Sequence, residues 1–220
     1  MNRNLSGALL AVGVLVLASL SCSALSSIMG SGALVEDDFS DSGSGWGTGT
    51  DADRSVEYSD NGLHMQVFTK DYFVWSTPDT KDYDKVHMEV TVNNNGTDAT
   101  TAFGFMCYQQ PVDSSFYYFA ITPAGEYAIA KASLAASDVF LTNNDEWATS
   151  DAIAANAPSY RVGADCGNGT LTLYVDGKQI DSVSDSTYTS GGVGMFTWSG
   201  QDAASADVTF DDFVMTKLAP

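Results

Sequence analysis

The chain has 220 residues, of which 11% are aromatic and 20 are glycines, and its 28 acidic residues against 9 basic ones give a net charge of −19. This length suits one domain of β-sandwich size and a leader. A surface so acidic repels a phosphate backbone, which argues against nucleic acid as a partner. No long stretch has helical apolar spacing, and the glycine and aromatic content favours an all-β fold.

The first segment is typical of a secretory signal peptide. A single Arg3 precedes an uncharged, largely apolar run over residues 5–25. Three outcomes are open: lipidation of Cys22 after cleavage, release by a cut after Ala24, or retention of the uncut segment as a membrane anchor. Ser19 stands where a lipoprotein signal usually has Leu.

Lipidation is the outcome that the cysteine pattern favours, because Cys22 is the cysteine left outside the predicted domain. We therefore expect residues 1–22 to be a lipoprotein-type signal peptide and residues 23–34 to be a small-residue tether. The protein would then lie outside the cytoplasm, anchored to the membrane at the cell surface, with secretion as the alternative.

From residue 35 onward, strand patterns recur about every ten residues and are separated by turn residues such as Asn61-Gly62 and Asp176-Gly177. The predicted strands cover residues 55–59, 63–68, 72–77, 84–92, 101–109, 115–122, 126–132, 159–166, 170–175, 178–183, 193–198 and 207–216. Residues 143–157 are the one long irregular stretch. Without repeats or βαβ alternation, residues 35–218 predict a two-sheet antiparallel sandwich.

The two cysteines of the domain are expected to form a disulfide. Cys107 shares one strand face with Phe103 and Phe105, and Cys166 shares one with Val162 and Ala164. If both faces point into the core, the two cysteines can meet, and export permits the bond. The alternative is a pair of buried free thiols.

A family resemblance rests on the C-terminal third of the domain. The stretches YRVGADCGNGTLTLYVDGKQIDSV (160–183), SGGVGMFTW (190–198) and VTFDDFVM (208–215) resemble the laminin G-like, concanavalin A-like lectin and glucanase jelly rolls. More narrowly, the chain resembles the 3-keto-disaccharide-hydrolase-like domains of exported bacterial lipoproteins. The opening VEDDF (35–39) and Trp46 extend the likeness, which implies a jelly-roll sandwich over residues 35–218.

In such jelly rolls the first and last strands lie side by side, which would pair the two Asp-Asp-Phe segments of this chain. Strict alternation then places Asp37 and Asp212 among apolar neighbours, where a carboxylate needs a partner. One hypothesis is a structural Ca²⁺ held by Asp37 and Asp212 with Asp38 and Asp211 as further ligands. The alternative is an ordinary hydrogen-bonded carboxylate, and no other cofactor is expected.

The sequence carries no catalytic motif that we recognise. Glucanases of this fold alternate acids along one strand, whereas Glu89 stands alone between Met88 and Val90. His64 and His87 lie in predicted strands without a nucleophile or metal motif around them. The hydrolase activity of the resembling domains is therefore not carried over, and we expect no enzyme.

Exposed aromatic residues remain as candidates for ligand binding, since sugar rings stack on aromatic side chains. The candidates are Trp75, Trp147, Trp198, Tyr72 and Tyr117. Trp46 is expected to fill the end of the core instead. These residues predict a non-catalytic module that binds carbohydrate or another extracellular polymer. A structural or adhesion module with a cell-surface protein as partner is the alternative, and a glycoside-processing enzyme is a third possibility.

Overall fold

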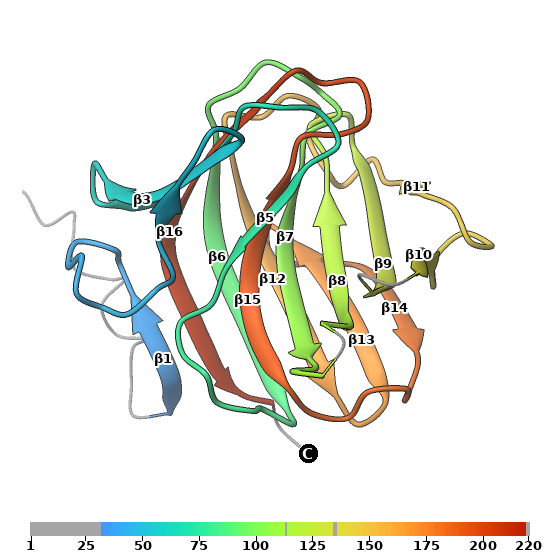
Figure 1. Cartoon of the computed structure of the whole chain (residues 1–220). Coiled ribbons are helices and arrows are strands. Elements are labelled where there is room, and N and C mark those ends of the chain that lie inside the picture. Colours follow the sequence, from blue (N-terminus) through green and yellow to red (C-terminus); the bar gives the residue numbers. More distant parts are fainter. Residues whose placement is uncertain (1–31, 113, 134–135, 219–220) are drawn as a thin grey trace, which may run out of the picture. The chain divides into compact units, whose positions relative to one another are not determined.

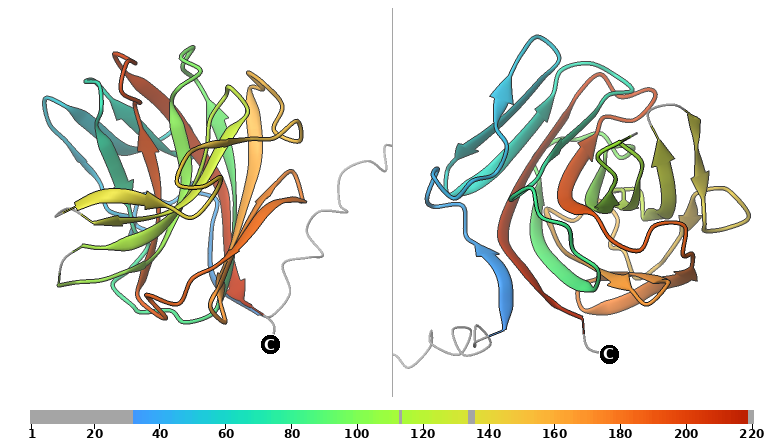
Figure 2. Two further views of the ribbon diagram at one scale, coloured as in Figure 1. Left: turned by 90° about the vertical axis from the view of Figure 1, so that its right-hand side faces the viewer. Right: turned by 60° about the horizontal axis from the view of Figure 1, so that its bottom comes forward.

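The computed structural model describes residues 32–112, 114–133 and 136–218, and in them the chain forms sixteen β-strands in two antiparallel sheets packed face to face (Figures 1 and 2). The predicted all-β two-sheet sandwich is confirmed. The predicted signal peptide, Cys22 and most of the tether lie outside the described residues. No helix among the described residues is long and apolar enough to cross a bilayer.

The larger sheet has nine strands. They are β1 Ala33–Asp37, β2 Gly49–Thr50, β3 Arg54–Ser59, β4 Gly62–Val67, β6 Val86–Asn94, β12 Ser159–Gly167, β13 Thr170–Val175, β14 Lys178–Ser184 and β16 Ala206–Lys217. Their order across the sheet is β14-β13-β12-β6-β16-β4-β3-β2, and β1 pairs with β16 beside β4.

The smaller sheet has seven strands. They are β5 Phe73–Ser76, β7 Ala102–Gln109, β8 Phe116–Ile121, β9 Glu126–Ser133, β10 Ala136–Phe140, β11 Ala148–Thr149 and β15 Gly192–Trp198. Their order is β10-β9-β8-β7-β15-β5, and β11 pairs with β9. β5 and β10 are therefore the two edges of this sheet.

The core lies between the sheets and follows from strand alternation. On β6, Val86, Met88, Val90 and Val92 are fully buried, while the residues between them stay partly exposed. Burying each such side chain contributes roughly 1.5–3 kcal/mol. The Cys107–Cys166 disulfide crosses this core from β7 to β12, so the two layers are covalently joined, as predicted.

The first and last strands of the domain pair, as the two Asp-Asp-Phe segments predicted. β1, drawn blue, lies antiparallel to the end of β16, drawn red, with Asp37 opposite Phe213 (Figure 1). Trp46 fills the end of the core here and contacts Phe39 and Phe213 edge-on. This position for Trp46 confirms the prediction.

The predicted burial of Asp212 is wrong, because a β-bulge interrupts the alternation of β16. The register with β6 shifts between Asp211 and Val214, and Asp212 has a φ of +50°. One extra residue moves every later side chain to the opposite face. Phe210 and Phe213 are therefore both buried, and Asp212 is exposed.

Candidate functional site

The outer face of the smaller sheet is apolar, although it lies opposite the core. β8 is buried along its whole length and β7 along all but its last residue, so both faces of these strands are covered. A second apolar cluster covers the outer face, separate from the core between the sheets. Its buried members are Ala102, Met106, Phe116, Tyr118, Ala120, Ala128, Ala130 and Phe196.

Small side chains on this face leave a cavity of 520 Å³. Ala102, Ala120 and Ala132 contribute to its lining from three neighbouring strands. Gly104 lies in β7 between two core phenylalanines, and a Cβ there would approach the Phe119 carbonyl oxygen to 2.0 Å. Gly104 thus lets β7 and β8 approach each other closely, and the alanine side chains are too small to fill the cavity.

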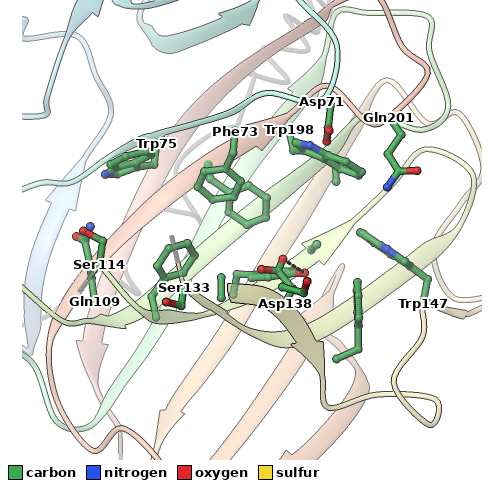
Figure 3. Close-up of a pocket in the computed structure, with 18 residues that line it drawn as sticks. Asp71, Phe73, Trp75, Gln109, Ser114, Ser133, Asp138, Trp147, Trp198 and Gln201 are labelled. Atoms are coloured by element: carbon green, nitrogen blue, oxygen red, sulfur yellow. Dashed lines mark hydrogen bonds between the residues drawn. The ribbon is translucent and has the colours of Figure 1, made fainter. Parts of the chain in front are cut away.

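Aromatic side chains form the rest of the cavity. In the view of Figure 3, Trp75, Phe73 and Trp198 follow one another along one side, and Trp147 lies at the end away from Trp75. Trp75 and Phe73 come from the edge strand β5, and Trp198 ends β15. The lining reaches β10 at the other edge through Phe140, so the cavity extends across the sheet from edge to edge.

The loop before β11 places Trp147 at the cavity. Asn143, Asn144 and Asp145 all have positive φ, a conformation that Asn and Asp tolerate better than most residues. The Asp145 carboxylate accepts a hydrogen bond from the Phe140 amide at 2.7 Å, and the Asn143 amide donates to the Trp147 carbonyl at 2.6 Å. This polar loop therefore has a structural role that fixes Trp147.

Contacts between rings fix the orientation of the aromatic side chains that line the cavity. Phe73 stacks on Phe196 with centroids 4.6 Å apart and an interplanar angle of 18°. Tyr118 meets Phe196 edge-on at 5.8 Å, and Phe140 contacts Trp147 at 5.9 Å. Such pairs restrict each other's rotamers, so these aromatics present a largely fixed surface to a ligand.

Besides the Tyr118 hydroxyl and the indoles, seven side chains bring polar groups to the cavity, and five of the seven are neutral. They are those of Asp71, Gln109, Ser114, Ser133, Ser137, Asp138 and Gln201. The Tyr118 hydroxyl donates to the Asp138 carboxylate at 3.0 Å. Burial against the apolar wall raises the pKa of Asp138, and the Tyr118 hydrogen bond opposes that shift only in part. Burial also raises the pKa of Tyr118, so this phenol stays protonated.

The structure brings three of the five predicted aromatic residues together. Trp75, Trp147 and Trp198 all line the cavity, and Trp75 is 39% exposed. Tyr72 and Tyr117 do not line it, because both pack against the core between the sheets. Tyr117 is fully buried there, so its prediction as a ligand-binding residue is wrong.

Sequence reasoning missed several residues that line the cavity. They are Phe73, Phe116, Tyr118, Asp138, Phe140 and Phe196. Tyr117 is paired across the sheet with Cys107, and directly opposite residues share a face. Tyr117 therefore faces the core with the disulfide, and Phe116 and Tyr118 face outward, a register that the sequence alone did not specify.

The four aspartates proposed for calcium do not lie in this cavity. Asp37 accepts hydrogen bonds from the Trp46 indole and the Phe39 amide, both at 2.8 Å, which satisfies it without a metal. Burial and the charges of Asp212 and Asp38 raise the pKa of Asp211. Within the described ranges, no three His, Cys, Asp or Glu side chains form a group that could hold a metal ion. Calcium binding stays a prediction.

The two histidines lie on the outer face of the larger sheet, as expected for strand histidines. His64 contacts the Asp207 carboxylate at 2.7 Å, and His87 contacts Asp165 at 2.6 Å. Neither lines the cavity. The carboxylates that do line it, Asp71 and Asp138, come from different elements and not from one alternating strand.

Fold and site together define a concanavalin A-like jelly-roll sandwich with an aromatic cavity on the outer face of one sheet. Similar solved structures share that fold. The carbohydrate-binding module CBM66 from Bacillus subtilis aligns with a TM-score of 0.58 and 16% identity, over 79% of this chain and 96% of its own. A Bacillus subtilis protein of unknown function with a galectin-like fold aligns with a TM-score of 0.63 and 11% identity, over 85% and 96%.

A β-glucanase from Bacillus licheniformis aligns with a TM-score of 0.55 and 13% identity, over 86% of this chain and 99% of its own. At these identities the likeness shows the fold and confirms the predicted lectin and glucanase jelly roll. No protein-family model matches the sequence, and no curated protein matches it. The likeness to the 3-keto-disaccharide-hydrolase-like domains therefore rests on the sequence motifs alone.

Proposed function

We propose that the protein is an exported carbohydrate-binding module without catalytic activity, and that the glycan lies in the aromatic cavity of the smaller sheet. The observation that carries the proposal is an apolar cavity that spans the sheet on its outer face, with Trp75, Trp147 and Trp198 in its lining. An apolar hollow with a few polar groups is the usual form of a ligand site. CBM66, a carbohydrate-binding module by name, shares the fold.

The cavity has the dimensions of a site for several sugar units. Strands lie about 4.8 Å apart, so the six strands from β5 to β10 span roughly 24 Å. Trp75 and Trp147 belong to opposite ends of that span in Figure 3. Flat aromatic surfaces at both ends suit the internal part of a linear chain better than a single terminal sugar.

The proposal is tested by a glycan array and by calorimetry with the full chain in detergent. Trp75→Ala and Trp147→Ala should each weaken binding of an array hit by about tenfold or more, because both remove a stacking surface. Phe68→Ala is the matched control, since Phe68 is 47% exposed and does not line the cavity. It should bind like the parent chain.

Three outcomes would overturn the proposal. If a sample that unfolds cooperatively binds no glycan on the array, a structural or adhesion function is favoured instead. Binding that survives both tryptophan changes would place the site elsewhere. Release of reducing ends from a bound glycan, lost in Asp138→Asn, would make the protein a glycoside-processing enzyme like the β-glucanase of the same fold.

We further propose that the protein is held at the cell surface by a lipid on Cys22. The uncharged run over residues 5–25 and the disulfide of the domain both suit export. Cys22→Ser should move the protein from the membrane fraction to the soluble fraction. A protein that stays in the membrane after this change is anchored by its uncut leader instead.

A further inference from the structure

The cavity carries negative charge without internal compensation. Of the 18 residues that line it, Asp71 and Asp138 are acidic and none is Lys or Arg. The whole chain adds to this, with 28 acidic and 9 basic residues. A carboxylated or sulfated glycan entering this cavity would meet repulsion and no cationic partner.

Asp138 is the acid most directly placed to act on a ligand. Its side chain lies among the aromatic residues of the cavity, and the Tyr118 hydroxyl is its hydrogen-bond donor at 3.0 Å (Figure 3). A carboxylate has about four acceptor positions, so one donor leaves most of them available. Among the described residues no Lys, Arg or His forms an ion pair with Asp138. Asp185, by contrast, is paired with Lys131 at 2.9 Å.

The rings around Asp138 favour a cation as the missing partner. Tyr118, Phe116, Phe140 and Trp147 line the same cavity. The faces of aromatic rings carry negative electrostatic potential and attract ammonium groups, most strongly when water is displaced. Asp138 is itself exposed at the cavity, so an ammonium group of a ligand can reach its carboxylate directly.

We propose that the cavity selects glycans that carry free amino groups, with Asp138 as the counter-ion of the sugar ammonium, and that it discriminates against acidic glycans. This inference rests on the proposed function and specifies its substrate class. A hydroxyl in place of the ammonium group would keep the hydrogen bond to Asp138 and lose the charge. Neutral glycans would therefore bind more weakly.

The test compares two probes of equal length and linkage: a β-1,4-linked glucosamine hexamer and its N-acetylated counterpart. Calorimetry uses the full chain at about pH 6, below the pKa of the sugar amines, which neighbouring oxygens lower from that of a simple alkylamine. The free-amine hexamer should bind at least about tenfold more tightly, as expected for a hydrogen bond to a charged group. Asp138→Asn should reduce the ratio of the two affinities to about one.

The matched control is Asp60→Asn, which removes the same charge from the surface. Asp60 is exposed in the turn between β3 and β4, and its positive φ suits Asn equally well. This variant should keep the preference of the parent chain. The control separates recognition by Asp138 from attraction of a polycation to a chain of net charge −19.

The outcomes distinguish the inference from the proposed function. Equal affinity for the two hexamers, or binding of neutral glycans in preference to both, overturns the inference and leaves a carbohydrate-binding module. A preference that persists in Asp138→Asn overturns it as well, because general electrostatic attraction then accounts for the difference. A well-folded chain that binds no glycan at all overturns both.

Discussion

The outer faces of the two sheets differ in how their polar groups are partnered. On the larger sheet, His87 and Glu89 of β6 face Asp165 and Arg161 of β12, with contacts of 2.6 Å from His87 to Asp165 and 3.3 Å from Arg161 to Glu89. The Tyr174 hydroxyl donates to the second Asp165 oxygen at 2.8 Å. These charged groups of β6 and β12 are therefore paired with one another.

The outer face of the smaller sheet has the opposite character. A second cluster of eight buried apolar residues lies on this face, and its Asp138 has a single phenol as hydrogen-bond partner. Partly buried aromatic residues, among them Phe73, Trp147 and Trp198, pack against this cluster and border the cavity. The difference is consistent with the proposed division of roles, in which the larger sheet supports the fold and the smaller sheet presents the ligand site.

The largest expected effect concerns the bond that joins the two layers. Replacing both Cys107 and Cys166 by Ala should lower the free energy of unfolding by about 4 kcal/mol, because the disulfide closes a loop of 59 residues. The two sheets of this variant should still unfold together. Tryptophan fluorescence and far-UV circular dichroism should therefore report the same urea transition. Two separate transitions would mean that the faces do not share one core.

The second prediction contrasts two tryptophans. Trp46 is 4% exposed and its indole donates to Asp37, so Trp46→Ala should cost about 3 kcal/mol of stability. Trp75, at the cavity, is 39% exposed, and Trp75→Ala should cost less than about 1 kcal/mol while it impairs ligand binding. Urea unfolding of the two variants gives the comparison. Equal costs would show that the cavity aromatics serve stability instead of binding.

Part of the larger sheet could be predicted because strands such as β6 bury only one face. Val86, Met88, Val90 and Val92 alternate with polar residues, and the Asp60-Asn61 turn fixes the pairing of β3 with β4. The cysteine pairing followed from the same alternation. A single buried face leaves a period of two in the sequence, which specifies both strand and register.

The cavity could be predicted only in part, because alternation loses its meaning where both faces are apolar. In residues 115–122 every position is buried, so the period of two could not tell Tyr117 from Tyr118. β10, which carries Asp138, is exposed over four of its five residues, so its sequence has no alternation that predicts a strand. The bulge at Asp212 changed the phase of β16 without a glycine to mark it. Trp147 was found because it stands alone in a polar loop.

The smallest predicted effect concerns pH and the polar face. Hydrogen bonds to Asp165 and then Glu89 raise the pKa of His87 to about 9, against a usual 6.5. The protonated imidazolium therefore stabilises the fold fully below about pH 6.5, and this contribution is lost as the pH rises through about 9. A third of the side chain is exposed, so screening limits the effect to about 1 kcal/mol.

Urea unfolding at about pH 6 and pH 9.5 measures it. In His87→Gln the free energy of unfolding should depend less on pH. In the cavity variant Trp75→Ala the pH dependence should remain, because Trp75 lies on the other sheet, away from His87. If the free energy of unfolding of His87→Gln changes with pH as in the parent chain, another group titrates. The charged contacts of His87 would then not distinguish the larger sheet from the smaller one.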